Sequence, residues 1–148
     1  MSLSIREATA ADLPAIESLL AASDLPTADL ASARPVFVVA CNDSNVVGAG
    51  ALQFFGDSAL LRSMVVSTGS QRAGIGALVL QRLEELAIAR GIRDIGLLTQ
   101  TAKPFFLKHG YALADRQELP ALHASDEFKT LCPASADCMR KRLNAASL

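Results

Sequence analysis

Residues 64–76 read MVVSTGSQRAGIG, and the rest of the chain is organised around them. The apolar start predicts a short strand that ends at Ser67, and the residues after the glycines follow a helical period to about Arg90. The polar turn between these two elements contains Gln71, Arg72, Gly74 and Gly76. The first N–H groups of a helix lack intrahelical partners, and the helix dipole places partial positive charge at the same end. The turn is therefore predicted to bind an anion such as a phosphate or a pyrophosphate.

The composition indicates a well-packed protein with one core. The chain has 148 residues, is 51% hydrophobic and 20% charged, and has a mean hydropathy of +0.30. This length predicts one domain over residues 1–143, followed by a frayed tail over residues 144–148. The 14 Lys and Arg residues against 15 Asp and Glu residues give a formal net charge of −1. Because there is no basic excess, we expect neither nucleic acid nor a membrane surface as a partner.

The N-terminal residues and the cysteines favour a cytoplasmic location. Residues 1–14 contain no basic region followed by an apolar stretch, so we expect no signal peptide. No apolar run approaches the ~20 residues that a membrane span needs. Cys41, Cys132 and Cys138 form an odd set without the spacing of a secreted disulfide framework, which favours a reducing compartment.

Periodicity and turn signals predict an α/β domain with a mixed, mostly antiparallel sheet flanked by helices. Helical patterns cover about residues 12–20, 75–90 and 103–109, and a short helix is expected within residues 22–33. Strands are expected over residues 4–8, 36–41, 46–55, 59–67, 95–99, 111–119 and 137–143. Short turns separate the three strands between residues 36 and 67, which predicts an antiparallel meander. Residues 120–129 are expected to form a loop or a short helical segment.

The order of these elements and the pattern Gln71-x-x-Gly74-x-Gly76 resemble the GCN5-related N-acetyltransferase (GNAT) family over nearly the whole chain. In that family, the pattern Q/R-x-x-G-x-G/A binds the pyrophosphate of acetyl-coenzyme A. The resemblance implies parallel strands that splay apart where the coenzyme enters. Taken alone, the pattern fits an ordinary turn between a strand and a helix equally well. The implied coenzyme-binding residues of the turn are Gln71, Arg72, Ala73, Gly74, Ile75 and Gly76.

A second block supports the resemblance. Residues 99–111, TQTAKPFFLKHGY, keep the spacing of a family segment that runs from an Asn, through an Ala and a Tyr, to Gly-Phe. Thr99 replaces that Asn, Phe106 replaces the Tyr and Tyr111 replaces the Phe. The family Tyr often protonates the departing thiolate, and Phe106 cannot do so. The resemblance still places Thr99 and Phe106 beside the coenzyme, with Phe106 as an apolar wall near the thioester.

The strand before the turn carries the predicted acyl end of the site. Strict alternation would place the side chains of Leu60, Arg62, Met64 and Val66 on one face. The resemblance implies that the backbone of this strand contacts the acetyl carbonyl and the pantetheine arm, with Met64, Val65 and Val66 as the contact residues. Leu60 occupies the position at which histone-type relatives carry a glutamate base. A mechanism that uses that base is therefore not expected.

Arg62 is predicted to lie one alternation from the acetyl site. Its guanidinium suits a carboxylate, a phosphonate or an arsenical oxyanion, which predicts an anionic group on the acceptor. An ion pair at the surface or at the strand end explains Arg62 equally well. The general base is not identified from the sequence. A chain of water molecules is the preferred route for the proton. His123 and Glu127, which come late in the chain, are the alternative candidates for the base.

The segment over residues 128–139 resembles more narrowly the acetyltransferases associated with bacterial arsenic-resistance operons. Some of those enzymes acetylate amino-acid-like compounds with a phosphinic or arsinic group. The shared residues are Phe128, Lys129, Leu131, Cys132, Pro133, Ser135, Cys138 and Met139. Five residues separate Cys132 from Cys138, which is no metal-ligand spacing. Ordinary packing is therefore preferred to metalloid binding, and no metal is expected.

Together, these features predict an N-acetyltransferase with acetyl-CoA as co-substrate. Its acceptor is expected to be the primary amine of a small, anionic, amino-acid-like molecule, which attacks directly in a ternary complex. The protein is expected to be a monomer or a homodimer. Two alternatives stay open: a non-catalytic acyl-CoA-binding module or sensor, since Leu60 and Phe106 remove two familiar catalytic groups, and an acetyltransferase that acts on proteins or peptides.

Overall fold

The fold is built on one mixed sheet. The structure, a computed structural model, describes residues 3–25, 27–67, 69, 74–131 and 135–143. Among these residues, the sheet has the strand order β1-β2-β3-β4-β5-β7-β6. Neighbouring strands are antiparallel except for the parallel pair of β4 and β5. The strands are β1 (Leu3–Glu7), β2 (Val36–Asn42), β3 (Asn45–Phe55), β4 (Ser58–Val66), β5 (Asp94–Thr99), β6 (Ala112–Leu113) and β7 (Asp137–Arg142).

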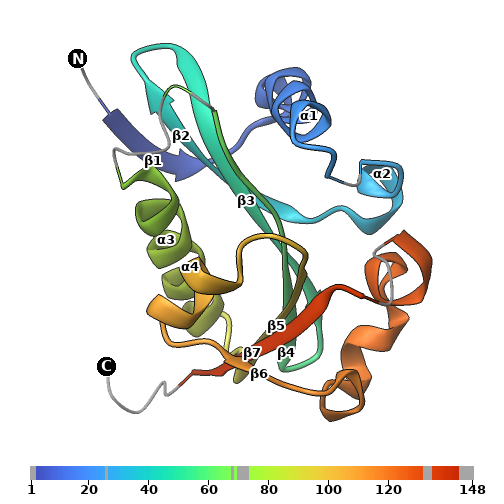
Figure 1. The fold of residues 1–148 in the computed structure, drawn as a ribbon. Helices are drawn as coiled ribbons and strands as arrows, with labels where there is room; N and C mark the ends of the chain where they lie inside the picture. Colours follow the sequence, from blue (N-terminus) through green and yellow to red (C-terminus); the bar gives the residue numbers. More distant parts are fainter. Residues whose placement is uncertain (1–2, 26, 68, 70–73, 132–134, 144–148) are drawn as a thin grey trace.

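Helices cover both faces of the sheet (Figure 1). On one face lie α3 (Ile75–Ala89) and α4 (Lys103–Lys108). On the other lie α1 (Leu13–Ala22), α2 (Leu30–Ala33) and the late segment, residues 116–131. The late segment consists of 3-10 turns at Arg116–Glu118 and Pro120–Ala124 and a π-helical turn at Glu127–Leu131. The predicted α/β class and the helix over 75–90 are thus confirmed.

Each face has its own apolar core. Against α3, buried residues of the sheet such as Leu52 and Leu61 pack with Val79 and Leu83 of the helix. The core under α1 contains Ile16, Leu20, Phe37, Val39 and Val65. The late segment packs against the same face, where Leu119, Leu122 and Phe128 surround Leu60. Burial of these side chains on both faces is what holds the seven strands in one layer.

Gly96 of β5 allows the late segment to lie directly on the sheet. A Cβ atom at this position would lie 2.5 Å from Leu122 Cδ1 and 2.6 Å from Leu119 Cδ1. Real Cβ contacts are never that short, so a side chain here would push the late segment outward.

The predicted meander of three strands is confirmed, but the strand expected over residues 111–119 is mostly wrong. Its pairing with β7 covers only Ala112 and Leu113. The chain then turns away because the Asp115 N–H donates to Glu118 Oε2 at 2.7 Å, the capping interaction of a 3-10 turn. An Asp followed three residues later by a Glu is a helix-start signal, and it dominates over the apolar residues nearby.

A β-bulge in β4 overturns the alternation expected along that strand. Ala49 pairs with Val65 and Ala51 pairs with Arg62, so two residues, Ser63 and Met64, stand opposite Gly50 alone. Ser63 has a φ of 60°, a left-handed conformation that a non-glycine residue seldom adopts.

As a result, the expectation that Leu60, Arg62, Met64 and Val66 share a face is wrong. Leu60 packs under the late segment, whereas Met64 and Val66 pack against the α3 core. The extra residue at the bulge reverses the side-chain alternation beyond it.

The parallel strands β4 and β5 separate after Leu60, before the bulge in β4. Their pairing joins Ser58 to Asp94, Ala59 to Ile95 and Leu60 to Gly96. This confirms the expected splay of parallel strands. The edge of β4 beyond Leu60 is therefore not paired with β5, and it borders the site described below.

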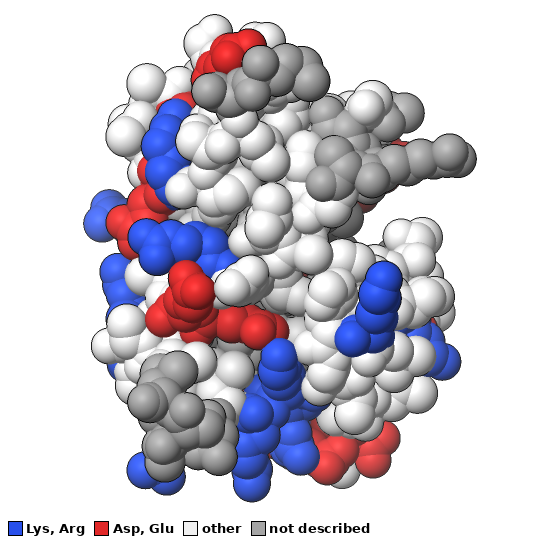
Figure 2. All heavy atoms as spheres, turned by 90° about the vertical axis from the view of Figure 1, so that its left-hand side faces the viewer, with Lys and Arg blue, Asp and Glu red and all other residues white. Residues whose placement is uncertain are grey.

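Charges of both signs are mixed over the face shown in Figure 2, where Lys and Arg residues lie next to Asp and Glu residues. In the part of the chain that the structure describes, no helix combines the length and the hydropathy needed to cross a bilayer. The tail expected over residues 144–148 lies outside the described residues.

Candidate active site

A cavity of about 480 Å³ opens where β4 and β5 part. Its walls come from residues 61–66 of β4, residues 97–102 at the end of β5, and residues 23–25 after α1. Phe106 of α4 and Glu127 of the late segment complete the lining. The cavity therefore draws on both faces of the sheet at the gap between the parallel strands.

At one end, the cavity has an apolar wall built on α4. Phe106 is buried, and its ring lies edge-on to Phe105 and Tyr111, with centroid separations of 5.1 Å and 5.4 Å. Met64 and Val66 approach from β4, and all three line or flank the same space. The structure thus brings Phe106 together with residues 64–66, as an acyl-binding end requires.

The N-terminus of α3 contains the glycines of the predicted anion-binding turn. Gly74 caps the helix with a φ of 73°, and a Cβ there would meet no atom within 4 Å. Gly76 lies against Phe105 and Val66, at 3.5 Å and 3.7 Å from the position of an added Cβ. The side chain of Ile75 is buried in the core. The predicted contacts of Gln71, Arg72 and Ala73 fall outside the described residues.

Thr99 closes the end of β5 and lines the cavity. Its Oγ1 accepts a hydrogen bond from the backbone N–H of Ala102 at 3.0 Å. This bond shapes the turn that leads into α4 and so places Phe106.

At the other end, the cavity meets a buried ionic cluster around Arg62. The Arg62 guanidinium donates from Nη1 and Nη2 to the two carboxylate oxygens of Asp29, both at 2.6 Å. Its Nε lies 3.1 Å from Glu127 Oε2, and Nη1 also donates to Gln53 Oε1 at 3.2 Å. The exposed fractions of the three charged side chains are 0% for Arg62, 4% for Asp29 and 5% for Glu127.

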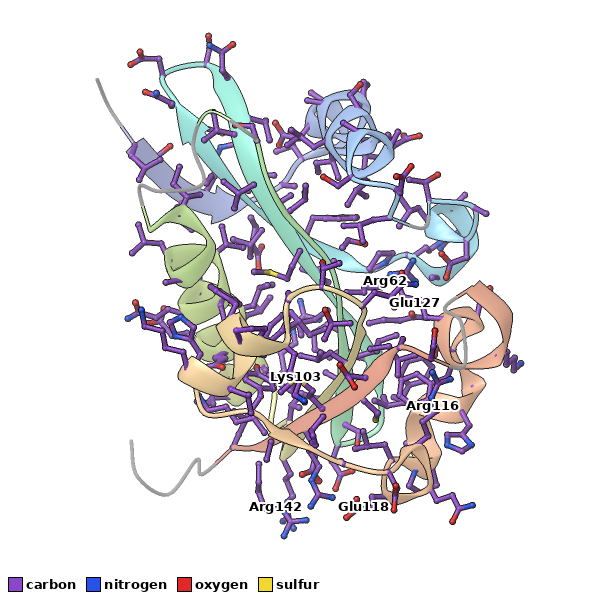
Figure 3. The ribbon with its side chains drawn as sticks, in the orientation of Figure 1. Arg62, Lys103, Arg116, Glu118, Glu127 and Arg142 are labelled. Carbon is purple, nitrogen blue, oxygen red and sulfur yellow. The ribbon has the colours of Figure 1, made fainter. Side chains whose placement is uncertain are left out.

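The cluster joins three elements that are distant in the sequence. Asp29 precedes α2, Arg62 lies in β4 and Glu127 begins the π-helical turn of the late segment, and Figure 3 shows Arg62 beside Glu127. The sequence left open an ion pair of Arg62 at the surface or at the strand end. The ion pairs that Arg62 forms are buried. Its single positive charge faces two carboxylates, so it is already compensated within the protein. An anchoring role for an anionic acceptor group stays a prediction.

The two predicted alternatives for the base are placed differently. Glu127 lines the cavity. His123 is exposed, its Nε2 lies 2.7 Å from the backbone oxygen of Arg116, and it is absent from the cavity wall. Leu60, at the position of the family's glutamate base, is fully buried against Leu122 and Phe128. Only Glu127 of these residues is positioned to meet a ligand in the cavity.

Sequence reasoning missed three residues of the site, Ser63, Asp29 and Gln53. Ser63 lines the cavity and is 7% exposed, and its Oγ has no hydrogen-bond partner among the described residues. A signal was present in the sequence, since the polar pair Arg62 and Ser63 interrupts the apolar run of β4 and a glycine, Gly50, interrupts the strand before it. Asp29 and Gln53 gave no such signal because only the fold brings them to Arg62.

Tyr111 does not substitute for the missing family tyrosine. Its hydroxyl donates to Glu84 Oε2 at 2.9 Å, and Lys141 Nζ lies 3.0 Å from Glu84 Oε1. Burial, followed by the negative charge of Glu84, raises the pKa of Tyr111. The hydroxyl is therefore held away from the cavity and is a poor proton source.

The two cysteines that the structure describes, Cys41 and Cys138, are both buried and free. Cys138 is buried beside Leu60, and burial raises the pKa of its thiol. Cys132 lies outside the described residues. Within the described ranges, no group of three or more His, Cys, Asp or Glu side chains is arranged to hold a metal ion.

Comparison with known proteins gives a family match. The model of the acetyltransferase (GNAT) domain matches residues 33–113, which is more than half of the chain. The matched range includes the glycine turn, the splayed strands and Phe106. No curated protein sequence matches the chain.

Solved structures share the fold. N-acetylglutamate synthase from Neisseria gonorrhoeae, complexed with coenzyme A and N-acetyl-glutamate, is 24% identical with a TM-score of 0.83, and the match covers 97% of this chain and 36% of that one. Rv2747 from Mycobacterium tuberculosis, in complex with CoA and NLQ, is 23% identical with a TM-score of 0.76, covering 95% and 99%. Tetrahymena GCN5 is 11% identical with a TM-score of 0.80, covering 96% and 97%. The chain spans about a third of the length of the synthase.

Proposed function

The chain belongs to the GNAT acetyltransferase family, and on that premise we propose that it transfers the acetyl group of acetyl-CoA to the primary amine of a small amino-acid-like acceptor. Family membership confirms the expected enzyme class, an acyltransferase. The proposed catalytic unit is the domain expected over residues 1–143. A reducing cytoplasm and a monomer or homodimer stay predictions.

The observation that carries this proposal is the cavity itself. It joins the released edge of β4, residues 64–66, to a buried ionic cluster through one continuous space of about 480 Å³. Backbone groups of Met64 and Val66 are assigned to the acetyl carbonyl, where fixed dipoles stabilise the charge that develops on the oxygen. Holding the amine and the thioester side by side supplies much of the acceleration in a ternary complex.

The coenzyme-binding residues fit the same assignment. The first helical hydrogen bond of α3 runs from the Leu78 N–H to the Gly74 oxygen, so the N–H groups before Leu78 have no intrahelical partner. The open space over Gly74 leaves room for phosphate oxygens, and the turn at residues 71–73 would complete their binding. Two of the similar structures, those from N. gonorrhoeae and M. tuberculosis, contain coenzyme A, in agreement with acetyl-CoA as co-substrate.

The amino-acid-like acceptor is supported by the chemistry of the cavity and by the relatives. Structures of the similar synthase contain N-acetyl-glutamate or L-arginine. The resemblance of residues 128–139 to arsenic-resistance acetyltransferases extends the proposal to phosphinic and arsinic analogues of amino acids. Because Arg62 is compensated by Asp29 and Glu127, the proposal directs the amine of the acceptor, and not its anionic group, toward this cluster.

A second candidate function is a non-catalytic acyl-CoA-binding module. Two observations favour it. Leu60 is a fully buried core residue at the position of the family base, and Phe106 offers no proton at the position of the family tyrosine.

A thiol-release assay with acetyl-CoA separates the two functions. The acceptors are L-glutamate, L-glutamine, L-methionine, the phosphinic analogue of glutamate, putrescine and a short peptide, with a reaction that lacks an acceptor as the blank. We expect thiol release matched by an acetylated amine in the mass spectrum for an amino-acid-like acceptor. No release with any acceptor, together with coenzyme binding measured by calorimetry, would establish the binding module instead.

A further inference from the structure

We propose that Ser63 and Glu127 form a subsite for the ammonium group of the acceptor. The acceptor would enter this end of the cavity as a cation and be oriented there. It would give one proton to water, and the neutral amine would then attack the thioester carbon, forming the C–N bond as the C–S bond breaks. Coenzyme A would leave as the thiolate and take up the second proton lost by the nitrogen. This inference rests on the proposed acetyl transfer and adds the residues that select and orient the amine.

The first support is the unusual state of Ser63. A buried hydroxyl without a hydrogen-bond partner costs free energy, and so does a left-handed backbone at a residue other than glycine. Ser63 has both features, and the residue belongs to the cavity lining. Such costs persist at positions where the surrounding fold enforces them and where a ligand supplies the missing partner. An amine N–H donated to Ser63 Oγ would supply it.

The second support is the charge of the same cavity end. Glu127 is buried, lines the cavity and is held by Arg62 Nε at 3.1 Å. Arg62 is in turn fixed by the two-pronged contact with Asp29. The cluster therefore has two carboxylates for one guanidinium, and Asp24 adds a further carboxylate to the cavity wall.

The carboxylates of Asp29 and Glu127 are buried, so solvent screens their attraction for a cation only weakly. Hydrogen bonds between an ammonium group and a carboxylate are also among the stronger ones in proteins. Arg62 acts here as a positioning residue that fixes the direction of the Glu127 carboxylate, and Ser63, the next residue of β4, adds a neutral oxygen. The subsite favours primary amines over acceptors that would place an anionic group in this position.

The test compares Ser63→Ala, Ser63→Gly and Glu127→Gln with the wild type in steady-state kinetics. Ser58→Ala, on the same strand but away from the cavity, and Asp126→Asn, an exposed neighbour of Glu127, are the matched controls. The acceptor probe is whichever of L-glutamate, L-glutamine and L-methionine the wild type acetylates best. Calorimetry with the same amine in the presence of free coenzyme A gives a second readout that needs no turnover.

We expect Ser63→Ala and Ser63→Gly to raise the KM for the amine by about tenfold, as for one lost hydrogen bond to a charged group. Glu127→Gln should raise it by tenfold or more, with the KM for acetyl-CoA unchanged within about twofold in all three variants. Both controls should match the wild type. The glycine variant suits the φ of 60°, so it keeps the test valid if the alanine variant is unstable.

Unchanged amine affinity in the two Ser63 variants and in Glu127→Gln, with an active wild type, would overturn the subsite and leave the proposed function standing. A wild type that acetylates none of the amines would overturn the proposed function itself. Equal rises in the KM values for amine and acetyl-CoA would also overturn the subsite, because they would indicate a general disturbance of the cavity.

Discussion

The two halves of β4 on either side of Ser63 differ in almost every structural respect. The half from Ser58 to Arg62 pairs with β3, and its first three residues also pair with β5. The half from Met64 to Val66 pairs with β3 alone. In the first half, Leu60 and Arg62 face the late segment and the ionic cluster, and Leu61 faces α3. In the second half the even-numbered residues change sides, since Met64 and Val66 face α3 and Val65 lies in the core under α1.

Under the proposed function, this one strand would serve two ligands. The first half would support the acceptor end of the cavity through Arg62, and the second half would present its backbone edge to the acyl end. Because the extra residue of the bulge reverses the side-chain alternation, the two ligands would approach from different sides of the sheet. A regular strand would place both sets of side chains on one face and leave no division between the two ends.

The largest expected effect on the free energy of unfolding comes from removing the guanidinium of Arg62 in the first half of β4. Arg62→Ala leaves Asp29 and Glu127 buried without their guanidinium, and breaking a buried ion pair in this way costs about 3–5 kcal/mol. We expect the free energy of unfolding in urea, followed by circular dichroism, to fall by that amount.

Arg82→Ala is the matched control, because its pair with Glu85 is half-exposed with a separation of 3.7 Å. It should change the free energy of unfolding by less than about 0.5 kcal/mol. Equal losses in the two variants would show that the buried cluster contributes no more to stability than a surface pair.

The second expected effect concerns the partner of the bulge. A Cβ at Gly50 would collide with Met64 Sδ and would lie 2.8 Å from Leu83 Cδ1. Gly50→Ala should therefore lower the free energy of unfolding by about 1–3 kcal/mol through overpacking. It should also raise the KM for acetyl-CoA, because Met64 is displaced from the acyl end.

A double-mutant cycle with Met64→Ala checks the cause. The extra loss on adding Gly50→Ala should be smaller in the Met64→Ala background, since the nearest obstructing atom is then gone. Strictly additive losses would mean that Gly50 does not make room for the Met64 side chain.

The sequence predicted the elements well where a local signal decides them. The helix after Gly74 and the three strands of the meander follow from periodicity and turn residues. The strand expected over 111–119 ends early because Asp115 and Glu118 form a helix cap. The hydrogen bond of this cap turns the backbone away from the sheet.

The site was less predictable because its parts are set by tertiary contacts. The alternation of side chains along β4 fails at Ser63. The absence of a side chain at Gly50 leaves room there for Met64 beside Leu83 of α3, and so permits the extra residue. Arg62 was found as a charge near the site, but its partners Asp29 and Glu127 are separated from it by long stretches of chain. No local sequence pattern predicts the contacts of Arg62 with Asp29 and Glu127. The net charge around Arg62 could therefore not be deduced from the sequence.

The smallest expected effect comes from Asp12, which lies outside β4. Its substitution should change the free energy of unfolding and leave the geometry of the site unchanged. Asp12 accepts from Arg6 Nη1 at 2.8 Å and from the Thr9 N–H at 2.7 Å, and these contacts, Arg6 first, lower its pKa from 3.8 to about 2. Because the pKa is lowered in the folded state, the stabilisation is complete above pH 4 and is lost as the pH falls from about 4 to about 2. Asp12→Asn should cost about 1 kcal/mol at pH 7.

Urea denaturation at several pH values measures this contribution. The Asn variant should lose less stability than the wild type between pH 4 and pH 2, and its KM values for both substrates should stay within about twofold of the wild type. Parallel acid profiles for the two proteins would assign the acid sensitivity to other carboxylates.

The short parallel ladder between β4 and β5 also bears on the order of folding. Strands β2, β3 and β4 are consecutive in the sequence and their contacts close short loops, whereas β7 must insert between β5 and β6 from the far end of the chain. The cavity needs β5, α4 and the late segment, and therefore no partly assembled meander contains it. Acetyl transfer would accordingly report the completion of folding, and regain of activity in refolding should lag behind the formation of the meander.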